Sequence, residues 1–73
     1  MARSLAEIAH RDGPVWLTVE QLAERLSIPR STIYQWRLKA YGPPGVRFGR
    51  FVRYRLADVE RWEQDQEALS RAR

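Results

Sequence analysis

The order of secondary structure is decided by residues 17–36, which read LTVEQLAERLSIPRSTIYQW. Thr18 followed by Gln21 has the pattern of a capping box, in which side chain and backbone bond reciprocally at a helix start. Apolar residues then recur at helical spacing, at Leu22, Ala23 and Leu26. This pattern predicts a short helix over about 18–26.

A second helix is expected directly after the first. Pro29 follows Ser27 and Ile28, and a proline both ends a preceding helical run and can open the next one. The second helix should run over about 30–40, with Ile33 and Trp36 on its buried face because they are three residues apart. The sequence therefore predicts two short helices joined by a tight turn.

The polar side chains of the second helix fall mainly on its outer face. At 100° per residue, the positions opposite the buried stripe are Ser31, Tyr34, Gln35 and Leu38. Arg30 and Lys39 lie on the flanks. Arg37 falls closer to the buried side, where it either reaches a phosphate or covers the edge of the core.

The segment after the second helix predicts a hairpin and a third helix. Residues 42–45 read GPPG, which is a rigid connector and not a helix. Two short alternating runs, 46–48 and 52–55, flank Gly49-Arg50, and each places apolar groups on one face and arginine on the other. A third helix is expected from about 57, and its apolar pattern fades after Trp62.

The positive charge is concentrated in the middle of the chain. The 73 residues carry a net charge of +4. Residues 25–57 contain eight basic residues and no acid, whereas the segments on either side each carry a net charge of −2. An acid-free basic block of this kind indicates a surface that binds a polyanion. The alternative is a solvated face whose charge is compensated elsewhere in the fold.

Composition and length exclude several classes of protein. The chain has no cysteine and 44% hydrophobic residues, so we expect one small domain in a reducing compartment, packed around aliphatic and aromatic side chains. We expect Trp36 and Trp62 to lie in the core, and Trp16 to pack against the start of the first helix. Arg25 and Arg61 are expected to be solvated.

The chain also lacks the features of an enzyme, a metal protein or a membrane protein. The sequence has no glycine-rich phosphate loop, no apolar run long enough to span a membrane and no signal peptide. His10 is the only histidine, and it has no ligand partners near it in the sequence. We therefore expect no catalysis, no metal, no cofactor and no small-molecule ligand.

Two helices joined by a turn, a basic hairpin and a covering helix are the parts of a winged helix-turn-helix, an α+β fold. The sequence resembles the small phage excisionases, whose DNA-binding module is shared by AlpA-type and MerR-type regulators. The resemblance covers residues 16–62 and is carried by WLTVEQLAERL at 16–26, STIYQW at 31–36, GPP at 42–44, and RFGRFVRY at 47–54 leading to DVERW at 58–62.

The sequence departs from the family pattern at two positions. The family often has glycine in the turn between its helices, whereas Ser27 stands here and must accept any left-handed backbone conformation. Pro29 occupies the place where the family commonly begins its recognition helix with serine or threonine, so one side-chain cap is lost.

The resemblance implies that the second helix enters the major groove of DNA and the hairpin wing lies on the minor groove or backbone. The implied DNA-binding residues of the recognition helix are Arg30, Ser31, Thr32, Tyr34, Gln35, Arg37 and Lys39. Those of the wing are Arg47, Arg50, Arg53 and Arg55. Gln35, Ser31 and Arg30 suit base edges, whereas Thr32 and Lys39 suit the backbone.

The resemblance further implies an excisionase, or recombination directionality factor. Such a protein binds the attachment-site arm, bends it and directs a phage integrase toward excision, in the cytoplasm of a bacterial host and in association with the nucleoid. A small AlpA-like transcriptional regulator is the alternative, since it would make the same contacts and differ only in its target site. The long dimerisation helix and effector domain of full MerR regulators are lacking, which argues against that subtype. A protein-interaction module that binds an acidic partner is a third reading.

One small module offers few base contacts, so we expect modest, salt-sensitive binding and self-association of several copies on DNA.

We expect the chain to be organised in three zones: an N-terminal arm at 1–13, the DNA-binding domain at 14–62, and the end of the third helix with the tail at 63–73.

Overall fold

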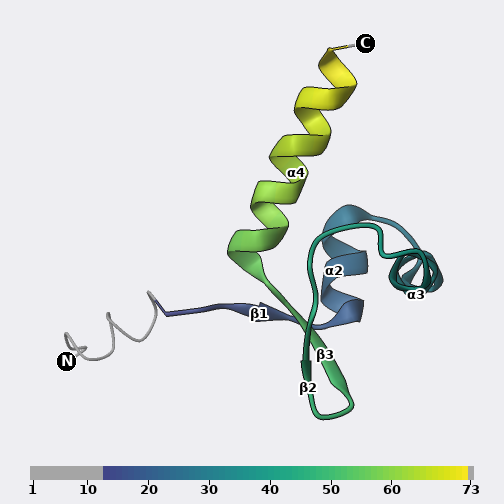
Figure 1. Ribbon diagram of the computed structural model, residues 1–73, viewed down its shortest axis with the longest axis vertical. Coiled ribbons are helices and arrows are strands. Elements are labelled where there is room, and N and C mark those ends of the chain that lie inside the picture. The colour runs from purple at the N-terminus through teal and green to yellow at the C-terminus, as the bar shows by residue number, and fades with distance from the viewer. Residues whose placement is uncertain (1–12, 73) are drawn as a thin grey trace.

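Helices and a small sheet alternate along the chain in the computed structural model, which describes residues 13–72. Their order is β1 (Trp16–Leu17), α2 (Val19–Leu26), α3 (Arg30–Leu38), β2 (Val46–Phe48), β3 (Phe51–Arg55) and α4 (Leu56–Arg71). The sheet is antiparallel, with strand order β1-β3-β2. Figure 1 shows α2 and α3 to one side of the strands, and α4 rising away from the body. This is the expected winged helix-turn-helix, with the hairpin of β2 and β3 as the wing.

The core is built from one fully buried side chain on each helix. Leu22 of α2, Ile33 of α3 and Val59 of α4 have no solvent exposure, and Tyr54 of β3 packs with them. Ile33 and Trp36 were the predicted inward residues of the second helix; Ile33 is fully buried, and Trp36 is half-buried and packs against the core. Removing these side chains from water fixes α3 against the body, so that the opposite face of this helix is left for a partner.

The start of α2 and the turn after it follow the sequence prediction. The Gln21 amide donates to Thr18 Oγ1 at 3.0 Å, and the Thr18 amide donates to Gln21 Oε1 at 2.9 Å, which completes the capping box. Ser27 then adopts a left-handed conformation with φ 58°. In this turn the Ile28 amide donates to the Ala23 carbonyl at 3.0 Å, which closes the helix end and turns the chain toward α3.

Helix α3 begins as expected and ends two residues early. Pro29 precedes it without a side-chain cap. The helix ends at Leu38 because Ala40 takes a left-handed φ of 54°, and the Tyr41 amide donates back to the Trp36 carbonyl at 2.9 Å. This is the bonding of a Schellman end. The expected helix to residue 40 is therefore wrong by one half-turn, and Lys39 caps the helix instead of lying within it.

Strand β1 was not expected from the sequence. It pairs with β3, with Trp16 opposite Arg55 and Leu17 opposite Tyr54. Because side chains alternate across a strand, Leu17 packs on the core and Trp16 lies on the other face, where its ring meets Phe48. The expectation that Trp16 packs against the start of the first helix is therefore wrong.

Helix α4 is longer than its apolar pattern suggested, reaching Arg71. Two contacts hold its middle against the helix-turn-helix. Trp62 packs on Trp36, with ring centroids 5.4 Å apart, and on Tyr41, at 6.0 Å. The next residue, Glu63, forms an ion pair with Arg25 of α2. Arg25 is exposed, as predicted, but its pairing with α4 was not predicted.

Residues 1–12 and 73 are not described by the structure. His10 and all but the last residue of the expected N-terminal arm lie outside residues 13–72. Within those residues, no helix is both long and apolar enough to cross a membrane.

Candidate nucleic-acid interface

The outer face of α3 carries the predicted polar side chains. Ser31, Tyr34 and Gln35 are exposed, and Leu38 is 89% exposed. These residues lie opposite Ile33, which is fully buried, so the packing of α3 on the core presents them together to solvent. The orientation predicted for this helix is confirmed.

The residues at the two ends of α3 have different surroundings. Arg30 is exposed and its Nη1 lies 3.4 Å from Glu20 Oε2 of α2. Thr32 is half-buried in the first turn, where its amide donates to the Pro29 carbonyl at 3.0 Å. Lys39 is exposed at the C-terminal cap. An exposed ion pair contributes little stability, so a phosphate or a base can replace Glu20 as the partner of Arg30 at small cost.

Arg37 lies between α3 and the wing. It is half-buried, and a Cβ placed on Gly45 would be 3.0 Å from Arg37 Nη1 and 3.2 Å from the Tyr54 ring. These contacts place Arg37 against the connector, in a shallow hollow of about 260 Å³. Of the two roles expected for Arg37, its surroundings match covering the edge of the core.

The hairpin does not carry its arginines as one strip. In the observed register Val46 faces Arg53, Arg47 faces Val52 and Phe48 faces Phe51. Directly opposed residues of antiparallel strands share a face, so Arg47 lies on the core side of the sheet and Arg53 on the other. Apolar and arginine side chains alternate along each strand, as predicted. The apolar residues of β2 lie on the same face as the arginines of β3, so one surface carries both apolar and cationic side chains.

We call this surface the aromatic–arginine face; it is formed by Trp16, Val46, Phe48, Phe51, Arg53 and Arg55. The guanidinium of Arg55 lies 4.7 Å from the centre of the Trp16 ring, and that of Arg53 lies 5.5 Å from the Phe51 ring. The rings of Trp16 and Phe48 meet edge to face at 5.1 Å. Cation–π contacts of this kind stabilise a guanidinium over a ring. Arg53 Nη1 also donates to the Val52 carbonyl at 2.8 Å.

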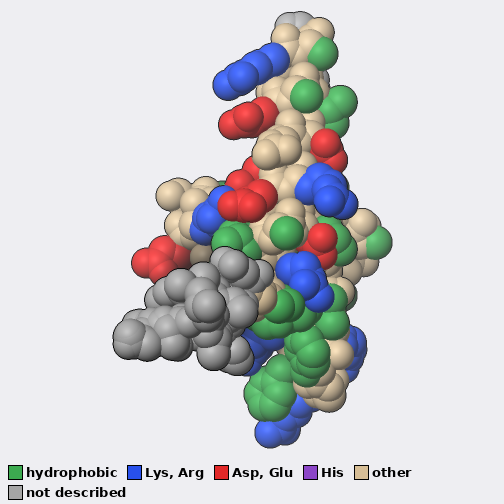
Figure 2. Space-filling model, turned by 90° about the vertical axis from the view of Figure 1, so that its left-hand side faces the viewer, with side chains coloured by type: hydrophobic (Ala, Val, Ile, Leu, Met, Phe, Trp, Pro, Cys, Tyr) green, Lys and Arg blue, Asp and Glu red, His purple; other side chains and the backbone are tan. Residues whose placement is uncertain are grey.

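Arg50 occupies the tip of the wing. It follows Gly49, whose φ of +64° suits the first position of a two-residue hairpin turn. The Arg50 guanidinium is 5.6 Å from the centre of the Phe51 ring, so two cations lie close to Phe51. In Figure 2, hydrophobic side chains gather at the hairpin end of the molecule, with basic side chains at its lowest point.

The aromatic–arginine face was not predicted from the sequence. A signal for it was present, because a turn at Gly49-Arg50 requires Phe48 to face Phe51. Counting outward from that turn gives the whole register without a structure.

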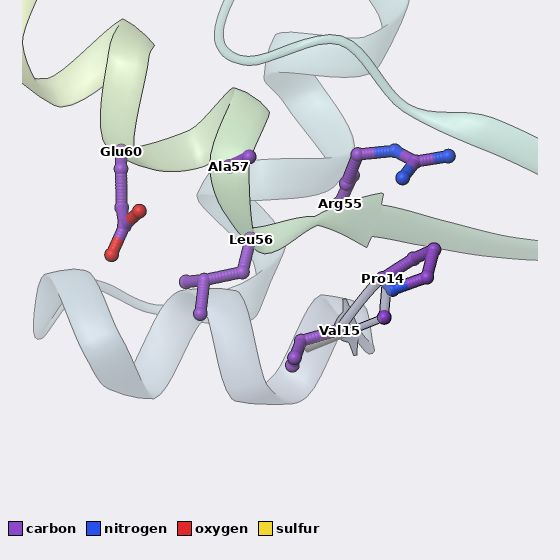
Figure 3. Close-up of a pocket in the computed structure, with 7 residues that line it drawn as sticks. Pro14, Val15, Arg55, Leu56, Ala57 and Glu60 are labelled. Atoms are coloured by element: carbon purple, nitrogen blue, oxygen red, sulfur yellow. The ribbon is translucent and has the colours of Figure 1, made fainter. Parts of the chain in front are cut away.

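The remaining hollows are shallow. One of about 340 Å³ lies where β3 continues into α4, lined by residues 13–15, 55–57 and Glu60. In Figure 3 the Leu56 and Glu60 side chains point to the same side of it, and Arg55 points away. Within residues 13–72, no three histidine or acidic side chains are grouped so as to hold a metal ion.

The geometry defines a helix-turn-helix with an arginine-bearing wing, which is the architecture of a small DNA-binding domain. A model of the helix-turn-helix domain family matches residues 16–67, and the chain belongs to this family. The match covers α2, the turn, α3, the wing and most of α4. Domains of this family bind DNA and are typically not enzymes. A comparison of this sequence with curated proteins found no significant match.

Proposed function

We propose that this protein binds double-stranded DNA, with α3 in the major groove and the wing on the adjacent minor groove. One observation carries the proposal: Ile33 anchors one face of α3 in the core, while the opposite face presents exposed Ser31, Tyr34 and Gln35. A helix fixed in this way can fit its outer face into a groove without losing its own packing.

The side chains of α3 fall into two groups by their chemistry. Gln35 suits the hydrogen-bonding edge of adenine, Ser31 suits either base type, and Arg30 can form a fork on guanine or hold a phosphate. Tyr34, Thr32, Arg37 and Lys39 bind the sugar-phosphate backbone and set the register of the helix in the groove. For Arg37 this requires its guanidinium to leave the connector.

The arginines of the wing are placed at different positions along the hairpin, from its tip to its base. Arg50 at the tip enters the minor groove. Arg47 and Arg53 bind phosphates from the two faces of the hairpin, and Arg55, stacked on Trp16, binds at its base. The acid-free stretch from residue 25 to 57 supports this role, since DNA carries a dense row of phosphates.

We further propose that the biological task is that of an excisionase. The resemblance along residues 16–62 supports this task, in which the protein binds repeated sites in an attachment-site arm, bends the DNA and favours excision by a phage integrase. Because one module makes few contacts, copies bound side by side would supply the missing affinity.

Recombination between attachment sites in vitro is the direct test. The integrase and attachment sites come from the genome that encodes this chain, and both directions of the reaction are followed with and without the protein. We expect excision to rise and integration to fall. Gln35→Ala should remove both effects, whereas Gln64→Ala on α4 is the matched control and should keep them.

Each result has a distinct meaning. No effect on either direction, together with sequence-specific DNA binding, would replace the excisionase by an AlpA-like regulator with the same contacts. No binding to DNA at all would overturn the whole proposal and leave an acidic protein partner for the basic surface. Independent and equal binding steps on a multi-site fragment would refute self-association.

A further inference from the structure

Two phenylalanines at the end of the wing remain largely exposed, although the Phe48 ring meets Trp16 edge to face. Phe48 is 48% exposed and Phe51 is 55% exposed. They face each other directly across the turn, so both rings project from the same side of the hairpin tip. Large aromatic side chains lose favourable burial in such a place, and this cost points to a partner that covers them.

The charges around these rings select the kind of partner. The guanidinium groups of Arg50 and Arg53 both lie close to the Phe51 ring, at 5.6 and 5.5 Å from its centre. The nearest acid along the chain after the wing is Asp58, in α4. A partner that fits must therefore offer an apolar slot with negative charges beside it. A base step viewed from the minor groove has this chemistry, because stacked bases lie between two phosphate backbones.

The tip is free to enter such a slot. A Cβ placed on Gly49 would have no atom within 4 Å, and every residue of β2 is exposed. The hairpin extends beyond the helical body in the direction opposite to the free end of α4 (Figure 1). A ring at this end can therefore approach DNA ahead of the rest of the domain.

We propose that Phe51, supported by Phe48, is an apolar wedge that opens a base step from the minor groove and so bends the DNA. Arg50 and Arg53 bind the phosphates on either side. The inference rests on the DNA binding proposed above and adds the side chain that produces the bend. Apolar wedges in known minor-groove proteins kink DNA by about 20–90° toward the major groove.

A DNA-bending measurement tests the wedge. The probe is a duplex enriched from a random-sequence library by the full-length wild-type protein, with a donor and an acceptor dye at its two ends. A second copy of the duplex carries 2-aminopurine at successive steps of the wing contact, where its fluorescence rises when a base is unstacked. Energy transfer is measured at saturating protein, so that weaker binding does not imitate a lost bend.

Three variants separate the wedge from charge and from folding. Phe51→Ala should bind within about tenfold of wild type, because the phosphate contacts remain, but should leave the DNA straight and the 2-aminopurine quenched. Phe51→Leu should keep the bend, since leucine also serves as a wedge. Leu69→Ala removes an exposed apolar side chain from α4 and should behave as wild type. Thermal unfolding followed by circular dichroism shows that each variant is folded.

Several results would overturn the wedge, and they are distinguishable from failure of DNA binding. A wild-type bend in Phe51→Ala, or loss of the bend in Phe51→Leu, contradicts it. Wild-type protein that binds DNA without bending it also refutes the wedge and leaves the proposed function standing. A protein that binds no DNA overturns both. If Phe51→Ala instead abolishes self-association in sedimentation without DNA, the face is a contact between copies.

Discussion

Arg25 of α2 and Glu63 of α4 are joined by two hydrogen bonds, from Nε to Oε2 at 2.6 Å and from Nη2 to Oε1 at 2.9 Å. The two side chains are 37% and 27% exposed, so water screens the pair only in part. This bidentate contact ties the first helix of the helix-turn-helix to the last helix of the chain. It fixes α4 at the residue directly after Trp62, where the apolar pattern ends.

Glu63→Gln should lower the free energy of unfolding by roughly 0.5–1 kcal/mol near neutral pH, since one partner of a partly exposed bidentate pair is lost. Urea unfolding followed by tryptophan fluorescence measures the change. Glu67→Gln, on an exposed position of the same helix, is the control and should change stability by much less. Equal stability of the two variants would contradict the role assigned to the pair.

The contribution of this pair should also depend on pH in a defined direction. The hydrogen bond from Arg25 lowers the pKa of Glu63 below its ordinary value of 4.5, and partial burial opposes this shift. A carboxyl whose folded pKa is depressed stabilises the fold above its unfolded pKa, and this stability is lost as pH falls through the folded pKa. The difference between wild type and Glu63→Gln should therefore shrink in acid. If the stability difference between wild type and Glu63→Gln is the same at neutral pH and at about pH 3, this pH dependence is refuted.

Gly42→Ala should destabilise the protein through a side-chain clash as well as through the backbone. Gly42 has φ +95°, and a Cβ there would lie 2.9 Å from Trp36 Cε3. We expect a loss of roughly 1–3 kcal/mol in thermal or urea unfolding, from the left-handed backbone and the displaced indole together. Gly49→Ala is the matched control, because its φ is also positive but no atom lies within 4 Å. Gly49→Ala should therefore lower the free energy of unfolding by less than Gly42→Ala does.

Ser27→Gly should stabilise the protein by up to about 1 kcal/mol, because glycine adopts the left-handed conformation without the strain of a Cβ. Ser27 has φ 58° and its exposed side chain takes part in no packing of the core. Ala40→Gly at φ 54° should give a gain of the same sign. Ser27→Ala keeps the Cβ, so a gain equal to that of Ser27→Gly would point to another cause.

Arg50→Ala should reduce the salt dependence of DNA binding. Each phosphate neutralised by a cation adds about 0.9 to the slope of log affinity against log salt. We expect the slope to fall by about 1 for Arg50→Ala, with affinity reduced across all sequences. Arg61→Ala, an exposed arginine of α4 outside the wing, should leave the slope unchanged. Equal slopes for the two variants would place Arg50 away from the DNA backbone.

Local patterns predicted the helix-turn-helix well. The capping box of Thr18 and Gln21 and the buried side of α3 follow from residues that interact within one or two turns, whereas the left-handed conformation of Ser27 was expected from the family resemblance. Such contacts are set by spacing alone, so one sequence is sufficient to predict them.

Contacts between distant parts of the chain were not predictable in this way. Strand β1 has only two residues and no pattern of its own, and its pairing depends on where β3 lies. Arg25 and Glu63 are 38 residues apart, so no local spacing connects them. The hairpin register is the intermediate case, since it follows from the turn once Phe48 and Phe51 are recognised as its two ends.

The position of β2 at the edge of the sheet has a consequence for the protein in solution. In the strand order β1-β3-β2, β2 leaves one row of backbone donors and acceptors without a strand beside it, next to exposed Val46 and Phe48. Such an edge can template cross-strand aggregation. Its length of three residues and the like charge of neighbouring arginines oppose this association. High ionic strength screens the repulsion between these arginines. The β2 edge is therefore least protected from association in concentrated, DNA-free protein at high salt.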